Sequence, residues 1–251
     1  MTFYPLLFQP NLHPVIWGGN QLRPYKGLEP SDEPIGESWE VSAVPSSPSI
    51  ISNGEWAGRD INSVISDYPE QILGKEVNKK YNGQLPLLAE VQQSSDVTYR
   101  IYDYHRPGLD GKPRELHTAL AAKALDYHVE KNYTTDYKES KDQAIQVVDS
   151  PYFDVRIIEL TKFFHRNLLK YDSFIISMCL EGHCKIRVRS TGDEILLHQG
   201  SSTLIPAIIA DYDVIPLNGK VRILDAFIDN MDHSVKGKLS RFIHIKNNKS
   251  S

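Results

Sequence analysis

Short runs of strand-forming residues, each closed by a turn, are the feature that most constrains how this chain can fold. Strands of this length, separated by turns at this spacing, are typical of antiparallel jelly rolls and small barrels. We therefore predict a mainly β fold of the jelly-roll type with a few short helices. From Tyr152 onward the runs are 155–160, 173–180, 184–188, 194–197, 202–205 and 221–228.

The first half of the chain mixes strand-like runs with two helical patterns. Strand-like runs lie at 14–17, 39–44 and 49–52. Asp60 is placed to cap a helix whose apolar residues follow at helical spacing, with Gly74 beyond its end. A second helix is expected from about Thr118 to Tyr127, with His117 at its entrance.

The composition and charge of the chain limit its size class and the partners that it could bind. The chain has 251 residues, of which 40% are hydrophobic, so it can bury a full core in one large or two small domains. A formal charge of −4 gives no reason to expect nucleic acid or an anionic membrane as a partner. The N-terminus lacks a basic start and is broken by Pro5, Pro10 and Pro14, so we expect no leader or membrane helix and a cytoplasmic protein.

The stretch Val97–Tyr104 resembles one wall of a polar pocket. If it is a strand, its side chains alternate between two faces. Arg100 then lies on the same face as Tyr102 and Tyr104, and Glu90 and Gln92 extend the polar run upstream. A strand with one face in water would carry the same mixture, so the pattern alone leaves both interpretations open.

The sequence offers no obvious metal site. A zinc or iron centre needs at least three converging ligands, commonly announced by a His-x-His pair. The nine histidines include no such pair and stand apart from one another in the sequence. Cys179 and Cys184 are too few for a disulfide framework, and we expect two buried free thiols.

Five motifs in fixed order, spanning residues 14 to about 127, resemble the compact bacterial form of type I mannose-6-phosphate isomerase. The run around Asp172–Phe174 and 200–206 is similar to the second cupin half of that family. The motifs are Trp17-Gly18-Gly19 followed by Leu22, then 36–42 (GESWEVS), 85–88 (LPLL), 92–103 (QQSSDVTYRIYD) and 113–117 (PRELH).

The resemblance implies a zinc-dependent isomerase that interconverts mannose 6-phosphate and fructose 6-phosphate through an enediol. Such chemistry needs a Lewis acid, a base and a cation near the developing negative charge. Arg100 matches the family arginine that supplies this cation. Trp17 matches a position at the pocket entrance, and Gln92 lies on the family's pocket strand. With Glu90 and Tyr102, these residues form our predicted substrate-binding set.

The departure from the family lies between Leu88 and Ala89. In the family, the segment after Leu-Pro-Leu-Leu supplies the zinc ligands and the phosphate-binding lysines. Here Leu88 is followed at once by Ala89-Glu90-Val91-Gln92-Gln93, so a stretch on the order of a hundred residues is missing. We therefore expect family membership with impaired activity, and zinc not bound at the family site.

We predict a truncated N-terminal cupin domain at 1–128, a connection at 129–150, a second cupin-like domain at 151–230 and a polar tail at 231–251. Missing strands leave sheet edges unpaired, so self-association is expected. Three interpretations stay open: an isomerase by descent that uses substitute ligands such as Glu90, Glu115 or His117, a non-catalytic protein that binds sugar phosphates, and the product of an internal deletion. A cupin-type regulator is a weaker fourth, because no recognition helix is visible.

Overall fold

A computed structural model gives the fold of the chain. It describes residues 2–85, 87–88, 92–93, 98–104, 107–108, 110–129, 137–138, 140–150 and 152–229. The chain divides into two compact units. The larger unit comprises Met1–Ser94 and Tyr137–Ser251, and the smaller unit comprises Ser95–Asp136. The predicted domain boundaries stay a prediction, and the predicted polar tail lies outside the described residues.

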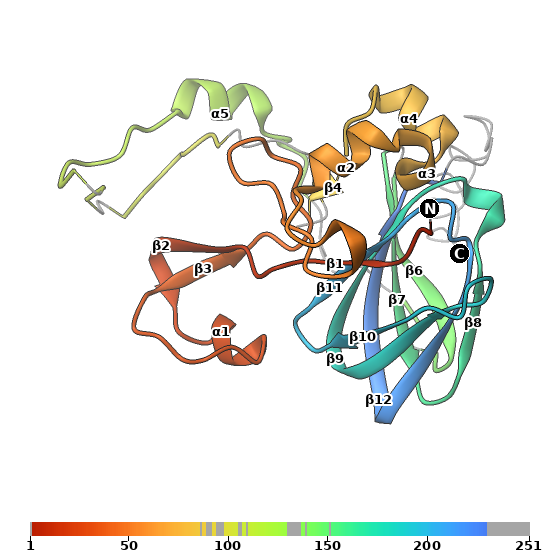
Figure 1. Cartoon of the computed structure of the whole chain (residues 1–251). Coiled ribbons are helices and arrows are strands. Elements are labelled where there is room, and N and C mark those ends of the chain that lie inside the picture. Colours follow the sequence, from red (N-terminus) through yellow and green to blue (C-terminus); the bar gives the residue numbers. More distant parts are fainter. Residues whose placement is uncertain are drawn as a thin grey trace, which may run out of the picture. The chain divides into compact units, whose positions relative to one another are not determined.

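An antiparallel sheet of eight strands dominates the larger unit (Figure 1). Its main path runs β1-β11-β9-β12-β7-β6, with β10 paired to β9 and β8 paired to β12. The predicted mainly β chain with a few short helices is thereby confirmed. The strands are β1 (Leu6–Leu7), β6 (Gln143–Asp149), β7 (Asp154–Leu160), β8 (Phe164–Asn167), β9 (Ile175–Val188), β10 (Glu194–His198), β11 (Ser202–Ile205) and β12 (Asp211–Phe227).

Two long strands, β9 and β12, form the centre of the sheet and differ from the sequence-based prediction. The predicted runs 173–180 and 184–188 are one continuous strand, because Gly182 does not end it. A Cβ on Gly182 would lie 2.3 Å from the carbonyl oxygen of Lys220, so the missing side chain lets β12 pass close by. The pairing register shifts at this point, between Leu217 and Arg222.

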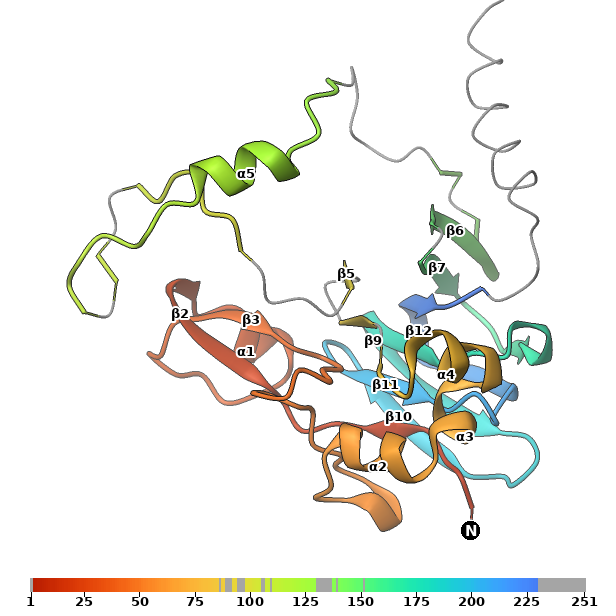
Figure 2. The same cartoon turned by 90° about the horizontal axis from the view of Figure 1, so that it is seen from above.

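Two apolar clusters stabilise the larger unit. The first lies within the curved sheet and includes Ile158, Leu160 and Ile223. Alternation places their neighbours, such as Ile157 and Glu159, on the opposite face. The second cluster lies between one end of the sheet and three short helices, which lie together in both views (Figure 2).

The first of the three helices begins where the sequence predicts. Asp60 caps α2 (Ile61–Asp67), because its carboxylate accepts a hydrogen bond from the Ser63 N–H at 3.0 Å. The single predicted helix is split at Pro69, where α3 (Pro69–Leu73) begins. A further helix, α4 (Lys75–Tyr81), follows Gly74 and was not predicted. Gly74 joins α3 and α4 with a φ of 94°, a backbone conformation that favours glycine.

The predicted strand at 39–44 is wrong. Strand β3 (Ile35–Ser38) ends before it, and the following residues form a buried loop. Here the Ser42 N–H donates to Ser49 Oγ at 2.8 Å, and the Ser42 carbonyl accepts from the Ser49 N–H at 2.8 Å. These local bonds satisfy the backbone without a neighbouring strand.

The remaining short elements of the larger unit flank this loop and the sheet. Strand β2 (Leu12–Gly19) contains the predicted run 14–17 and pairs with β3. The other short elements are α1 (Leu22–Tyr25), η1 (Gly54–Trp56), β4 (Leu87–Leu88), β5 (Gln92–Gln93) and η2 (Leu169–Tyr171).

Among its described residues, the smaller unit contains one helix, α5 (Thr118–Ala124). The predicted helix began at the same residue but extended to Tyr127. It ends earlier because Leu125 adopts an extended backbone conformation, with φ of −68° and ψ of 133°. Among the described helices, none has the length and apolar character needed to cross a membrane.

Candidate functional site

Arg100, the predicted catalytic residue, lies in an irregular segment of the smaller unit and not in a strand. The prediction of a strand over Val97–Tyr104 is wrong for residues 98–104. Two hydrogen bonds hold this backbone instead: the Arg100 N–H donates to His117 Nδ1 at 3.1 Å, and the His117 N–H donates to the Arg100 carbonyl at 2.6 Å. Tyr104 has a φ of 53°, which turns the chain away from an extended course.

The Arg100 guanidinium is also fixed by its surroundings. Its Nη1 donates to the carbonyl oxygen of Glu115 at 2.9 Å. A guanidinium has five N–H donors, so this contact orients the group and leaves donors that could meet an anionic ligand. The side chain that we predicted to stabilise charge is therefore held by a backbone carbonyl 15 residues further along the chain.

A second contact joins the same two segments of the smaller unit. Asp103 is buried and forms a two-pronged ion pair with Arg114, whose Nε lies 2.6 Å from Asp103 Oδ2. The hydrogen bonds to Asp103 raise the pKa of the Arg114 guanidinium. The predicted Arg-Glu-Leu-His run thus contributes local structure through its arginine and its histidine.

The other predicted substrate-binding residues lie on separate elements, and their joining Arg100 in one site stays a prediction. Tyr102 is in the same unit, but it is 58% exposed and packs edge-on against Tyr104 at 4.9 Å. Trp17 belongs to the larger unit, lies in β2 and is 48% exposed. Gln92 lies in β5, where its backbone pairs with Leu88, and Glu90 is outside the described residues.

Of the proposed substitute metal ligands, Glu115 and His117 alone do not make a zinc site, and Glu90 lies outside the described residues. Glu115 Oε2 lies 4.0 Å from His117 Nε2, and His117 Nδ1 already accepts the Arg100 N–H. Two donors fall short of the three protein ligands that catalytic zinc requires. Within the described ranges, no group of three or more His, Cys, Asp or Glu side chains is placed to hold a metal. These residues therefore do not fit the zinc ion that the family resemblance implies.

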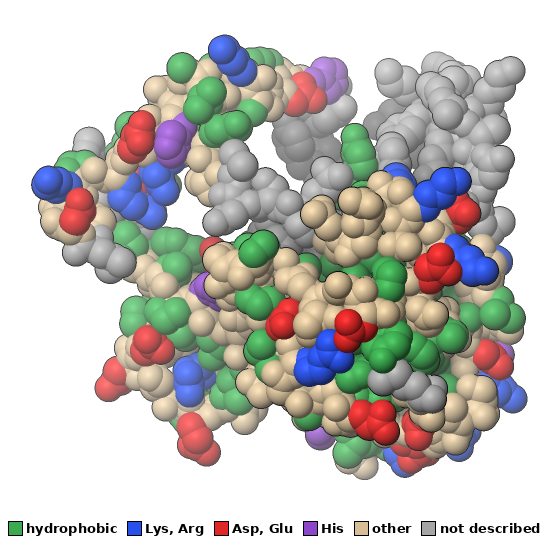
Figure 3. All heavy atoms as spheres, turned by 45° about the horizontal axis from the view of Figure 1, so that its top comes forward, with side chains coloured by type: hydrophobic (Ala, Val, Ile, Leu, Met, Phe, Trp, Pro, Cys, Tyr) green, Lys and Arg blue, Asp and Glu red, His purple; other side chains and the backbone are tan. Residues whose placement is uncertain are grey.

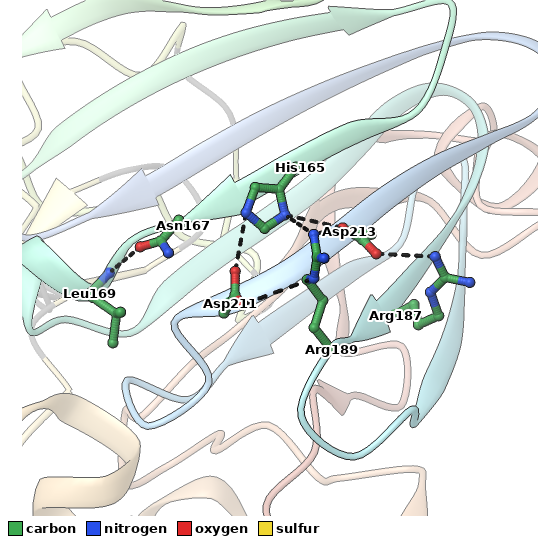
Figure 4. A network of polar contacts seen from close by, with 7 residues as sticks. All are labelled: His165, Asn167, Leu169, Arg187, Arg189, Asp211 and Asp213. Carbon is green, nitrogen blue, oxygen red and sulfur yellow. Dashed lines mark hydrogen bonds and ion pairs between the residues drawn. The ribbon is translucent and has the colours of Figure 1, made fainter.

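The sheet carries a polar network that sequence reasoning missed (Figure 4). His165 of β8 lies between two carboxylates of β12: its Nε2 is 3.2 Å from Asp211 and its Nδ1 is 3.2 Å from Asp213. Arg187 and Arg189 approach from β9 and the turn after it. Burial alone would raise the pKa of Asp213, but hydrogen bonds from His165 and Arg187 outweigh it and hold that pKa below its usual range.

A buried ion pair lies inside the same sheet. Arg166 Nη2 is 2.6 Å from Asp225 Oδ2, and Ser177 Oγ donates to the other carboxylate oxygen at 2.6 Å.

The free thiols Cys179 and Cys184 are buried, as predicted. Desolvation by burial raises the pKa of the Cys179 thiol to about 11, which keeps it protonated and unreactive at neutral pH.

Two exposed histidines, His183 and His198, also meet in space although the sequence separates them. They are direct partners across the β9–β10 pair, with ring centroids 5.3 Å apart. The absence of a His-x-His pair in the sequence therefore does not keep these two histidines apart in space. The signal that could have found this pair is the hairpin itself, because its turn brings these two positions opposite each other.

Comparison with known proteins relates this fold to one family. Residues 6–99 match the model of the type I phosphomannose isomerase catalytic domain. The chain is 23% identical over 306 residues to the probable mannose-6-phosphate isomerase GmuF of Bacillus subtilis, covering 84% of this chain and 96% of the relative. It is 32% identical over 92 residues to the mannose-6-phosphate isomerase of Streptococcus mutans, covering 37% of this chain and 28% of that protein.

Solved structures agree on the fold. The mannose 6-phosphate isomerase of Bacillus subtilis superposes with a TM-score of 0.70 at 20% identity, covering 88% of this chain and 99% of that one. The apo enzyme of Salmonella typhimurium gives 0.67 at 10% identity, covering 91% and 100%. The chain thus has a cupin-like β fold. More particularly, it is related to the type I phosphomannose isomerases through the match to their catalytic domain.

Proposed function

We propose that this chain derives from a mannose-6-phosphate isomerase that lost its central metal-binding segment, and that it retains little or no zinc-dependent isomerase activity. The missing segment lies between Leu88 and Ala89. One observation carries the proposal: the alignment with the relative GmuF is longer than this chain. It extends over 306 positions, whereas this chain has 251 residues.

The size of the gap follows from the coverage. The alignment uses 84% of the 251 residues, which is about 211, so about 95 of the 306 aligned positions have no counterpart here. The relative is covered over 96% of its length, so the loss is internal. Next to the proposed junction, β4 and β5 form an antiparallel pair with Leu88 opposite Gln92, only four positions further along the chain.

The residues that remain can do part of the chemistry. Moving a proton between C1 and C2 of a sugar phosphate needs a base, a group that polarises the carbonyl and a cation near the enediolate. Arg100 would serve as that cation, because its guanidinium is oriented by Glu115 and keeps donors for an oxyanion. Within the described residues, no group of three or more His, Cys, Asp or Glu side chains is placed to hold the metal that would polarise the carbonyl.

The test is the turnover of mannose 6-phosphate in a coupled assay, with zinc quantified on the same sample. We expect turnover close to the background of the assay, and the same low value for Arg100→Gln. Normal turnover with stoichiometric zinc, abolished in Arg100→Gln, would overturn the proposal.

A non-catalytic protein that binds sugar phosphates is the second candidate. Its support is the held position of Arg100, which could meet a phosphate or an oxyanion without any metal. Mannose 6-phosphate should then raise the midpoint of thermal unfolding without being converted, and Arg100→Gln should remove that shift. Resequencing the gene across the junction tests the third interpretation, an internal deletion in the gene.

A further inference from the structure

The outer face of the β9–β10 hairpin carries a pair of histidines that nothing above assigns to a function. His183 and His198 face each other in the antiparallel register, and both side chains are exposed. Their Nδ1 atoms are 3.4 Å apart, and their ring planes are inclined by 69°. Two ring nitrogens that converge in this way define a point between them that both can reach.

We propose that His183 and His198 form a surface site for zinc or a similar borderline divalent cation. Zinc binds histidine nitrogens at about 2.0–2.1 Å in tetrahedral geometry, which places two nitrogen ligands about 3.3–3.4 Å apart. The observed separation of the Nδ1 atoms equals this spacing. Water would complete the coordination shell at this exposed position, so the site is one of binding and not of catalysis.

A simple hydrogen bond between the two rings explains the geometry less well. The 3.4 Å separation is long for an N–H donor, whose bonds cluster near 2.9–3.0 Å. A hydrogen bond of this length would be weak. Both rings are exposed, so each could bind water just as well.

The backbone under the pair is already fixed, so little ordering is left for binding. The His198 N–H donates to Ser201 Oγ at 3.0 Å, and the Ser201 hydroxyl donates back to the His198 carbonyl at 2.5 Å. The strand that carries His183 is paired on both sides, with β10 and with β12. A preorganised pair binds a metal more tightly than two mobile side chains of the same kind.

Neighbouring charges do not oppose a cation at this point. Lys185 lies 2.7 Å from Glu194, and Lys220 lies 3.1 Å from Glu181. Each nearby lysine is thus matched by a carboxylate. Imidazole nitrogens favour zinc, copper or nickel over magnesium or calcium, which prefer oxygen ligands.

The inference goes beyond the proposed function and does not rest on it. It does change how a metal analysis is interpreted, because zinc bound at this hairpin would accompany the protein without any isomerase activity. A stoichiometric zinc content alone would therefore not identify an isomerase site.

Isothermal titration of the full chain with zinc chloride tests the site, with magnesium chloride as the comparison. We expect one zinc per chain at about pH 7.5, weaker binding at about pH 5.5 because protonated imidazoles cannot bind metal, and no binding of magnesium. His183→Ala and His198→Ala should each weaken zinc binding by more than about tenfold, the loss typical of removing a mere supporting contact. His128→Ala, a change at an exposed histidine elsewhere, should not.

Both histidines are exposed, so the variants should fold, and circular dichroism checks this. In addition, zinc should raise the unfolding midpoint of the unchanged chain and not that of His198→Ala. The proposal is overturned if zinc does not bind at submillimolar concentration, or if both alanine variants bind it as tightly as the unchanged chain. Neither result bears on the isomerase assay, so the two proposals fail independently.

Discussion

The curved sheet of the larger unit and the segment around Arg100 are stabilised in different ways. The sheet has two apolar clusters and a buried Arg166–Asp225 pair whose side chains are 5% and 3% exposed. In the smaller unit, the only buried side chains among the described residues are Asp103 and Ala121. There, the polar contacts of Arg100 and Asp103 do most of the ordering.

This difference shows that a segment can resemble the sequence of a family without being packed into a large apolar core. The match to the family model ends at residue 99, one residue before Arg100. Arg100 itself lies in the part of the chain with the smallest apolar core among the described residues. On the exterior of the larger unit, acidic and basic side chains are interspersed on the face shown in Figure 3. If a pocket once enclosed Arg100, the segment that we propose to be missing would have supplied part of its walls.

The largest effect is expected from Asp225→Ala. Removing one partner of a buried pair leaves the Arg166 charge uncompensated and should lower the free energy of unfolding by about 3–5 kcal/mol. Urea unfolding measures this loss. Arg189→Ala, a change at a half-exposed arginine on the same sheet, is the control and should cost less than about 1 kcal/mol. Equal losses in both variants would contradict a well-packed sheet interior.

A smaller loss is expected from Asp60→Ala at the start of α2. The substitution removes the acceptor for the Ser63 N–H and should cost about 1 kcal/mol. Chemical denaturation monitored by circular dichroism measures it. Because serine is also a good cap, Asp60→Ser should recover most of the stability, and failure to do so would point to another role for the carboxylate.

The Asp213 network predicts how the stability of the sheet depends on pH. The folded-state pKa of Asp213 lies below its unfolded value of about 3.9. The stabilisation is therefore complete above the unfolded pKa and is lost as the pH falls through the lower, folded-state pKa. Unfolding curves of the unchanged chain and Asp213→Asn should converge towards acid pH. Curves that stay parallel down to low pH would disprove this assignment.

The smallest effect on global stability is expected from Asp103→Ala in the smaller unit. Because little apolar surface depends on this contact, the unfolding midpoint should be almost unchanged. Hydrogen exchange should nevertheless become faster around Arg100 and Arg114, since their segments are joined through Asp103. A cooperative loss comparable to that of Asp225→Ala would remove the contrast between the two regions.

The sequence predicts the elements whose signals are local. The cap at Asp60, the start of α5 and strands β7, β10 and β11 follow from capping, periodicity and turn residues. Strand β8 was missed because three of its four residues, His165, Arg166 and Asn167, are polar. The first half of β12 was missed because Pro216, Asn218 and Gly219 resemble a turn. Pairing with neighbouring strands, a tertiary property, makes these segments strands: β8 pairs with β12, and the first half of β12 pairs with both β8 and β9.

The candidate site was harder to predict for the same reason. Arg100 was found through resemblance, whereas its partners, the Glu115 carbonyl and the His117 ring, depend on how two segments meet. The meeting of His183 and His198 likewise depends on the register of the hairpin. Spacing along the chain does not encode such contacts.

The most direct test of the central claim is the rate of mannose 6-phosphate isomerisation by the His183→Ala/His198→Ala double variant in excess zinc. This variant lacks the surface histidine pair, so any metal-dependent turnover must come from elsewhere in the chain. The loss of the central segment predicts a rate at the background of the assay. A zinc-dependent rate typical of enzymes, about 1–1,000 per second, would contradict it.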